Sequence, residues 1–173
     1  MTEILEILKY ILPSIIVFLT AYLLLRIYLK NEEKKKNLEL SMNRTETVLP
    51  LRLQAFERLV LLLERISPDS LVMRFKNTKL NVAQLQNELI NNVRTEFEHN
   101  LSQQTYISPQ AWEKIKMARS EIIKLINTSA AELKPGDQGI NLSKRILEKA
   151  MNMQNPPTQE ALQFLKSEVR DLF

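Results

Sequence analysis

The chain of 173 residues contains no cysteine, two glycines and one histidine. Without cysteine it can form neither a disulfide nor a thiolate metal site, which fits a reducing compartment. Because Gly136 and Gly139 are the only glycines, no glycine-rich loop is available to cradle a phosphate. A single histidine gives little support to a nucleophile activated by an imidazole base. These absences argue against an enzyme and predict no bound cofactor.

The sequence also has no alternating strand pattern and no internal repeat. Its seven prolines fall mostly between segments whose apolar residues recur every three or four positions. This distribution predicts an all-α protein with one N-terminal transmembrane helix and an irregular cytoplasmic bundle of five or six helices. We expect a transmembrane anchor over residues 1–29, a polar helical stem over residues 30–48 and the bundle over residues 49–173.

One long hydrophobic run is present, at the start of the chain. No charged residue occurs from Tyr10 to Leu25, and the apolar character continues to Leu29. A bilayer core requires about 20 apolar residues. Glu3 and Glu6 replace the positive start of a signal peptide, and no small-residue cleavage site follows. Apolar residues on every face argue against a buried core helix. The run therefore predicts a helix that remains in the membrane.

Basic residues cluster directly after this run. They are Arg26, Lys30, Lys34, Lys35 and Lys36, whereas the only basic side chain before the run is Lys9. An excess of lysine and arginine marks the cytoplasmic side of a membrane protein. We therefore expect the N-terminus outside and the C-terminal domain in the cytoplasm. The same basic residues would lie near anionic lipid head groups, so the lipid bilayer is the first expected partner.

The segment from Leu38 to Ile66 has two interpretations. Its apolar residues follow a 3,4 spacing over about four heptads, which would form a self-association seam and a homo-oligomer. Polar positions and Pro50 interrupt this seam, so the alternative is a stem that leads into a buried core helix opened by Pro50. A second apolar stripe within Leu51 to Ile66 predicts that this helix lies at the centre of the core.

Cap residues predict three further helix starts. Ser67-Pro68 and Ser108-Pro109 each combine an N-cap serine with a proline at the first helical position. Asn81 is the expected cap of a long helix from about Val82 to Gln104. Trp112 is in phase with the apolar residues that follow it, which indicates a core residue.

The string from Glu96 to Asn100 is the most suggestive of chemistry. Glu96 and His99 are spaced i,i+3, so both could reach one metal, as in half of the Glu-x-x-His arrangement of di-iron bundles. A complete site needs a second such motif and two more carboxylates, and His99 is the only histidine. We therefore assign no metal and expect a polar cluster that binds a partner or links helices. Its members are Arg94, Glu96, Glu98, His99, Asn100, Gln103 and Gln104.

A second group of charges lies on one expected helix. Its basic members are Lys114, Lys116, Arg119 and Lys124. Glu113 and Glu121 interleave with them, which favours a solvated face over a nucleic-acid surface. We expect no nucleic-acid partner.

Three strings carry a family resemblance: Leu49 to Val60, Glu96 to Gln104 and Phe164 to Arg170. Over essentially its whole length the chain resembles a family of small single-pass proteins from Bacteroidota that is known only as a domain of unknown function. The resemblance implies a bacterial origin and therefore the inner membrane. It implies no activity and no functional residues.

These expectations combine into a non-enzymatic, membrane-tethered helical interaction module. It would serve as a scaffold, accessory subunit or assembly factor of an inner-membrane complex, with other inner-membrane proteins as partners. One alternative is a stator-like stalk subunit, although Pro68, Pro109 and Pro156 limit a long helix to the first cytoplasmic segment. The other alternative is a metal-dependent enzyme that uses Glu96 and His99.

Overall fold

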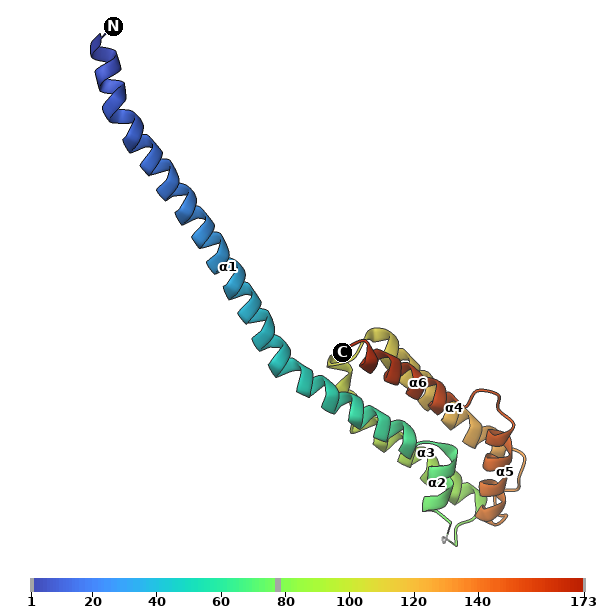
Figure 1. Cartoon of the computed structure of the whole chain (residues 1–173). Coiled ribbons are helices and arrows are strands. Elements are labelled where there is room, and N and C mark those ends of the chain that lie inside the picture. Colours follow the sequence, from blue (N-terminus) through green and yellow to red (C-terminus); the bar gives the residue numbers. More distant parts are fainter. Residues whose placement is uncertain (1, 77–78, 173) are drawn as a thin grey trace. The chain divides into compact units, whose positions relative to one another are not determined.

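The computed structural model describes the backbone of residues 2–76 and 79–172. It describes the side chains of residues 15–36, 48–76 and 79–172. Within these ranges the regular structure is helical, which confirms the predicted all-α class, and an isolated bridge joins Asn81 to Gln138. The chain divides into two compact units, Met1–Leu49 and Pro50–Phe173. Figure 1 shows the order of the helices along the chain.

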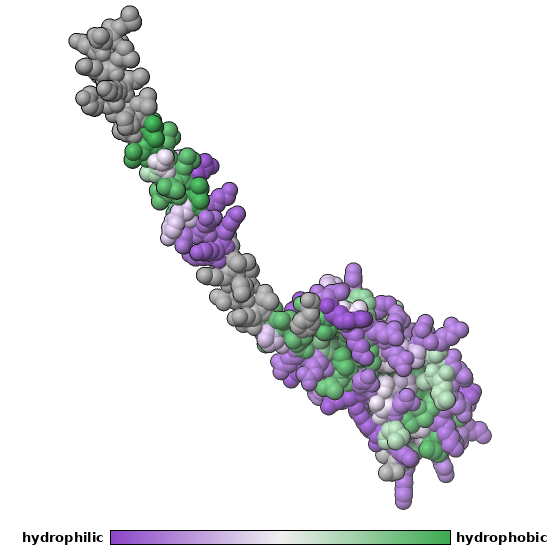
Figure 2. Space-filling model, in the orientation of Figure 1, coloured by the Kyte–Doolittle hydropathy of each residue, from purple (hydrophilic) through white to green (hydrophobic). Residues whose placement is uncertain are grey.

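The first unit is formed by the N-terminal part of helix α1 (Thr2–Arg65). Between residues 15 and 29 its large apolar side chains are at least half exposed on every side of the helix. Figure 2 shows this apolar band and the hydrophilic residues that follow it. The predicted basic cluster from Arg26 to Lys36 is exposed as well.

Among the residues whose side chains are described, no helix combines the length and the apolar character needed to cross a membrane. The predicted anchor begins within residues 1–14, whose side chains lie outside the described set. Part of the predicted stem, residues 37–47, lies outside it too.

Helix α1 continues through Pro50, so the expected helix start at this residue is wrong. A proline within a helix removes one backbone hydrogen bond and crowds a carbonyl of the preceding turn, at a cost of about 3 kcal/mol. The turns that follow bury Ala55, Phe56 and Leu59 almost completely. Burying large apolar side chains contributes about 1.5–3 kcal/mol each, which offsets that cost.

The C-terminal part of α1 lies in the core of the second unit, as predicted. Leu59, Leu62, Leu63 and Ile66 are among the most buried side chains of the chain. Leu51 is the exception, because 43% of it remains exposed. The heptad positions from Phe56 onward are thus buried within the unit, which favours the interpretation as a core helix over a self-association seam. Residues 38–45 of that seam lie outside the described side chains.

Over its described residues, the second unit is completed by five further α-helices and one 3-10 helix. They are α2 (Pro68–Arg74), α3 (Val82–Glu98), η1 (Leu101–Thr105), α4 (Pro109–Ala130), α5 (Gly139–Met151) and α6 (Pro157–Arg170). Helix α4 packs against α3, α5 and α6, and α5 also contacts α2 and α3. Figure 1 shows α4 and α6 side by side within this unit.

The three predicted N-caps are confirmed. The hydroxyl oxygens of Ser67 and Ser108 accept hydrogen bonds from the amides of Ser70 and Ala111. Asn81 and Gln84 form a reciprocal capping box, in which each side chain accepts a hydrogen bond from the other's backbone amide. Such caps satisfy amide groups that the first turn of a helix leaves without partners.

Helix α3 ends at Glu98, earlier than the expected Gln104. The Asn100 side chain donates a hydrogen bond to the carbonyl of Glu96 at 2.8 Å, and the Asn100 backbone leaves the helical region at φ −112° and ψ 8°. A side chain that satisfies a carbonyl of the last turn lets the helix end there. Leu101 follows the end of this helix and is 41% exposed.

Helix α5 begins at Gly139. The amide of Gly139 donates to the carbonyl of Leu80 at 2.9 Å, which ties this helix start to the residue before Asn81.

Trp112 is buried, with 9% of its surface exposed, as predicted for a core residue. Its ring stacks on that of Phe97, with 5.2 Å between the ring centroids. The guanidinium group of Arg119 lies 4.4 Å from the centroid of the Phe97 ring, in cation–π geometry. These contacts hold α4 against α3.

Candidate interaction groove

Glu96 of the predicted polar cluster forms ion pairs between helices. Its carboxylate accepts hydrogen bonds from Arg65 Nη1 at 3.2 Å and Arg74 Nη1 at 3.4 Å. The Glu96 side chain is 15% exposed. Arg74 also donates to the amide oxygen of Asn92 at 3.0 Å. This arrangement links the C-terminal ends of α1 and α2 to α3.

The other members of the polar cluster do not converge on one point. Asn100 caps α3, and Gln103 is buried and donates to the Ser102 hydroxyl. The exposed members are Arg94, Glu98, His99 and Gln104. Over the described part of the chain, no group of three or more histidine, aspartate or glutamate side chains could hold a metal ion. Two arginines thus occupy the Glu96 carboxylate, and the metal-dependent alternative that uses Glu96 and His99 stays a prediction.

Each basic side chain of the α4 group has a partner. Lys114 pairs with Glu160 of α6, Lys116 with Glu113 and Lys124 with Glu121. Arg119 lies over the Phe97 ring. Three of the four cations on this face thus pair with a glutamate, and the expectation of no nucleic-acid partner stays a prediction.

An open groove of about 640 Å³ lies in the second unit. We call it the α1–α6 groove, because one wall is formed by α1 and the other by α6. Its lining residues are Leu53, Phe56, Glu57, Val60, Leu165, Lys166, Val169 and Arg170. Leu165 and Phe56 are buried and form the floor, whereas Leu53, Val60 and Val169 are half-buried and form the sides.

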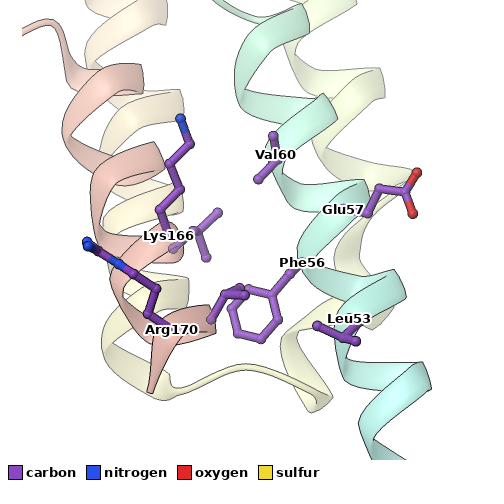
Figure 3. A pocket seen from close by; sticks show the side chains of 8 residues that line it. Leu53, Phe56, Glu57, Val60, Lys166 and Arg170 are labelled. Carbon is purple, nitrogen blue, oxygen red and sulfur yellow. The ribbon is translucent and has the colours of Figure 1, made fainter. Parts of the chain in front are cut away.

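Charged residues border the groove. Figure 3 shows Phe56 directed from α1 toward α6, while the Glu57 carboxylate points away from α6. Lys166 and Arg170 extend from α6 and are exposed. None of these three charged groups forms an ion pair with another described residue. The groove thus combines an apolar floor with free positive charge along α6 and free negative charge along α1.

A polar network fixes the two walls. Arg52 donates from Nε to the carbonyl oxygen of Tyr106 at 3.1 Å, and its Nη2 lies 3.7 Å from Glu168 Oε1. Glu168 in turn accepts hydrogen bonds from the backbone amide and the hydroxyl of Ser108. The network joins α1 to α6 through the segment that precedes α4. It holds the groove at one end without occupying its floor.

The comparison with protein families gives one match over nearly the whole chain. The family described as a family of unknown function (DUF7935) matches residues 2–172. The chain belongs to this family. No curated protein and no solved structure matches it. The expected resemblance to a family of unknown function is confirmed, whereas the Bacteroidota origin and the membrane anchor stay predictions.

Sequence reasoning did not identify the α1–α6 groove in this DUF7935 member. Two signals pointed toward it. Leu53 and Val60 are apolar but belong to neither of the stripes assigned to the core. Two of the three strings that carried the resemblance, Leu49 to Val60 and Phe164 to Arg170, include every residue that lines the groove. Neither signal predicts that these two segments lie next to each other in the folded chain.

Proposed function

We propose that this DUF7935 member is a membrane-tethered helical interaction module of the bacterial inner membrane. Residues 1–29 would be the anchor, and the second unit would act in the cytoplasm as a scaffold, accessory subunit or assembly factor. The observation that carries this proposal is the continuous exposure of large apolar side chains between residues 15 and 29.

Such a large exposed apolar surface would be unfavourable in water. Soluble monomers rarely expose contiguous apolar patches larger than a few hundred Å². The exposed residues in this segment are Ile15, Ile16, Val17, Phe18, Leu19, Tyr22, Leu23, Leu24, Leu25, Ile27, Tyr28 and Leu29. At the centre of a bilayer, leucine, isoleucine, phenylalanine and valine each favour insertion by about 0.3–0.6 kcal/mol. The charge-free run begins at Tyr10 in the sequence, which extends the segment toward the length of a membrane span.

The basic residues and the groove support the rest of the proposal. Arg26 and the four lysines up to Lys36 follow the apolar segment, which favours a cytoplasmic second unit. Attachment to a membrane raises the effective concentration of that unit toward other membrane proteins. The α1–α6 groove supplies a surface on which such a partner can bind.

Membrane attachment is tested by alkaline carbonate extraction of bacterial membranes that contain the full chain with a C-terminal tag. We expect the wild-type chain to remain in the membrane pellet. The double variant Phe18→Arg/Leu24→Arg should move to the soluble fraction, because each arginine opposes insertion by about 2.5–3.5 kcal/mol. Met73→Arg/Met151→Arg is the matched control, since both methionines are exposed in the second unit, and it should stay in the pellet.

Two results would overturn the proposal. One is a wild-type chain that is wholly soluble without detergent. The other is a reporter fused after Phe173 that maps to the outside of the cell. The interaction role is tested by cross-linking in intact membranes, where a reproducible membrane-protein partner is expected and its absence contradicts the role.

A further inference from the structure

We infer that the α1–α6 groove binds an amphipathic helix of a partner protein, and that this helix carries a pair of acidic residues along one flank. The inference rests on the proposed interaction role and adds the chemistry of the partner. It follows from the shape of the groove, the charges at its edges and the apolar surface that the chain itself exposes.

The shape of the groove fits a helix. Leu53, Phe56 and Val60 recur at i, i+3 and i+7 on α1, and Leu165 and Val169 at i and i+4 on α6. Two turns of helix are about 10 Å long, so the floor is a strip of that length between two helical walls. Apolar side chains at i, i+3 or i+4 and i+7 of a third helix would enter such a strip.

The charges along the groove determine which charged residues the partner helix should carry on each side. Lys166 and Arg170 are also spaced i,i+4, so the two residues lie on the same face of α6 one turn apart. Both are exposed and lack an acidic partner among the described residues. A ligand helix with two acidic residues one turn apart can pair with both. Glu57 on the opposite wall disfavours further acidic residues there and favours a basic one.

A second copy of this chain fits the groove less well. The exposed large apolar residues of the described second unit are Leu51, Leu61, Met73, Leu101, Tyr106, Met117, Ile140 and Met151. No two of them recur at three or four residues on one helix. Among the described side chains Leu51 has such a neighbour in Val48 of the first unit, and this pair is shorter than the i, i+3 and i+7 strip of the groove. The strip between residues 15 and 29 is flanked by Arg26 and Lys30, whose charge would repel Lys166 and Arg170. A partner with an acidic flank is the complementary occupant.

The test measures peptide binding to the full chain in nanodiscs of uncharged phosphatidylcholine. Two labelled synthetic helical peptides share leucines at i, i+3 and i+7 and differ only at two flank positions one turn apart, which are glutamate in one peptide and lysine in the other. By fluorescence anisotropy, we expect the acidic peptide to bind about tenfold more tightly than the basic one. Lys166→Glu/Arg170→Glu should reverse this preference.

A matched control changes the net charge of the chain by the same amount at residues outside the groove. Lys134→Glu/Lys144→Glu replaces two exposed lysines that line no part of the groove, and the wild-type preference should persist. Circular dichroism checks that both double variants keep the helical fold. All four substituted side chains are exposed, so we expect no loss of structure.

Three results would overturn the inference. Equal binding of the two peptides to the wild-type chain would show that the charges select nothing. A dimer that forms without peptide and is lost in Lys166→Glu/Arg170→Glu would assign the groove to a second copy. A bound lipid that the acidic peptide cannot displace would assign it to an acyl chain. None of these results affects carbonate extraction, so failure here is separable from failure of the membrane proposal.

Discussion

The carboxylate of Glu168 accepts hydrogen bonds from both the backbone amide and the hydroxyl of Ser108, at 2.9 and 2.8 Å. The same hydroxyl accepts a hydrogen bond from the amide of Ala111 as the N-cap of α4. One carboxylate of α6 therefore holds the start of α4, and Arg52 approaches it from α1.

Replacing this carboxylate should destabilise the second unit. Glu168→Gln keeps one acceptor oxygen but loses the charge and the second acceptor. Hydrogen bonds to charged groups contribute more than neutral ones, so we expect a loss of about 1–2 kcal/mol in the free energy of unfolding. Urea unfolding of the full chain in detergent measures it. Lys166→Gln on the same helix is the control, and an equal effect of both changes would contradict the assigned role.

The two glycines should respond differently to alanine. A Cβ atom on Gly139 would lie 2.7 Å from the Leu80 carbonyl oxygen and 3.1 Å from Leu85 Cδ2. Overpacking of this kind costs about 1–3 kcal/mol, so Gly139→Ala should lower the melting temperature. Nothing lies within 4 Å of the corresponding position at Gly136, and neither glycine has a positive φ. Gly136→Ala should be neutral or stabilise by about 0.4–1 kcal/mol, because alanine restricts the unfolded chain.

Ser129 should be a site of easy stabilisation. Its side chain is fully buried, and its hydroxyl has no hydrogen-bond partner in the described structure. An unsatisfied buried polar group costs about 1–3 kcal/mol, so Ser129→Ala should raise the melting temperature. Ser120→Ala on the exposed face of the same helix reports the gain from helix propensity alone, about 0.5 kcal/mol or less. Equal gains at the two sites would contradict the assigned cost.

Stability should depend on pH through Glu132. The hydrogen bond from Lys149, at 2.7 Å, and then that from Arg145 lower the pKa of Glu132 below its ordinary value of 4.5. A carboxylate with a lowered pKa contributes stability above the ordinary value and loses it as the pH falls through the lowered pKa. Glu132→Gln should therefore reduce stability at neutral pH and converge with wild type in acid.

Melting temperatures measured from neutral to acidic pH test this convergence. Because Glu132 and Arg145 are exposed, high salt should screen the interaction and reduce the difference between the two chains. A difference that persisted unchanged in both acid and high salt would show that Glu132 acts through packing instead.

Local chemistry made three of the helix starts predictable. Ser67, Asn81 and Ser108 each satisfy a backbone amide three residues ahead, so their effect is contained within a few residues of sequence. The apolar spacing from Leu59 to Ile66 likewise identified the core helix, because each buried position lies on one of its inward stripes.

Tertiary contacts decided what the sequence could not predict. The end of α3 depends on how Asn100 turns back onto Glu96, and the start of α5 depends on the distant carbonyl of Leu80. The two arginines on Glu96 come from other helices, which a string read by itself does not reveal. The α1–α6 groove requires knowing that the segments around Phe56 and Leu165, far apart in sequence, face each other.

The stack of Trp112 on Phe97 has a practical consequence. Trp112 is the chain's sole tryptophan, and its ring joins α4 to α3 in the core of the second unit. Its intrinsic fluorescence therefore comes from a single, water-shielded indole and reports on one helix contact. Every variant above can be followed optically in detergent or lipid without a chemical label.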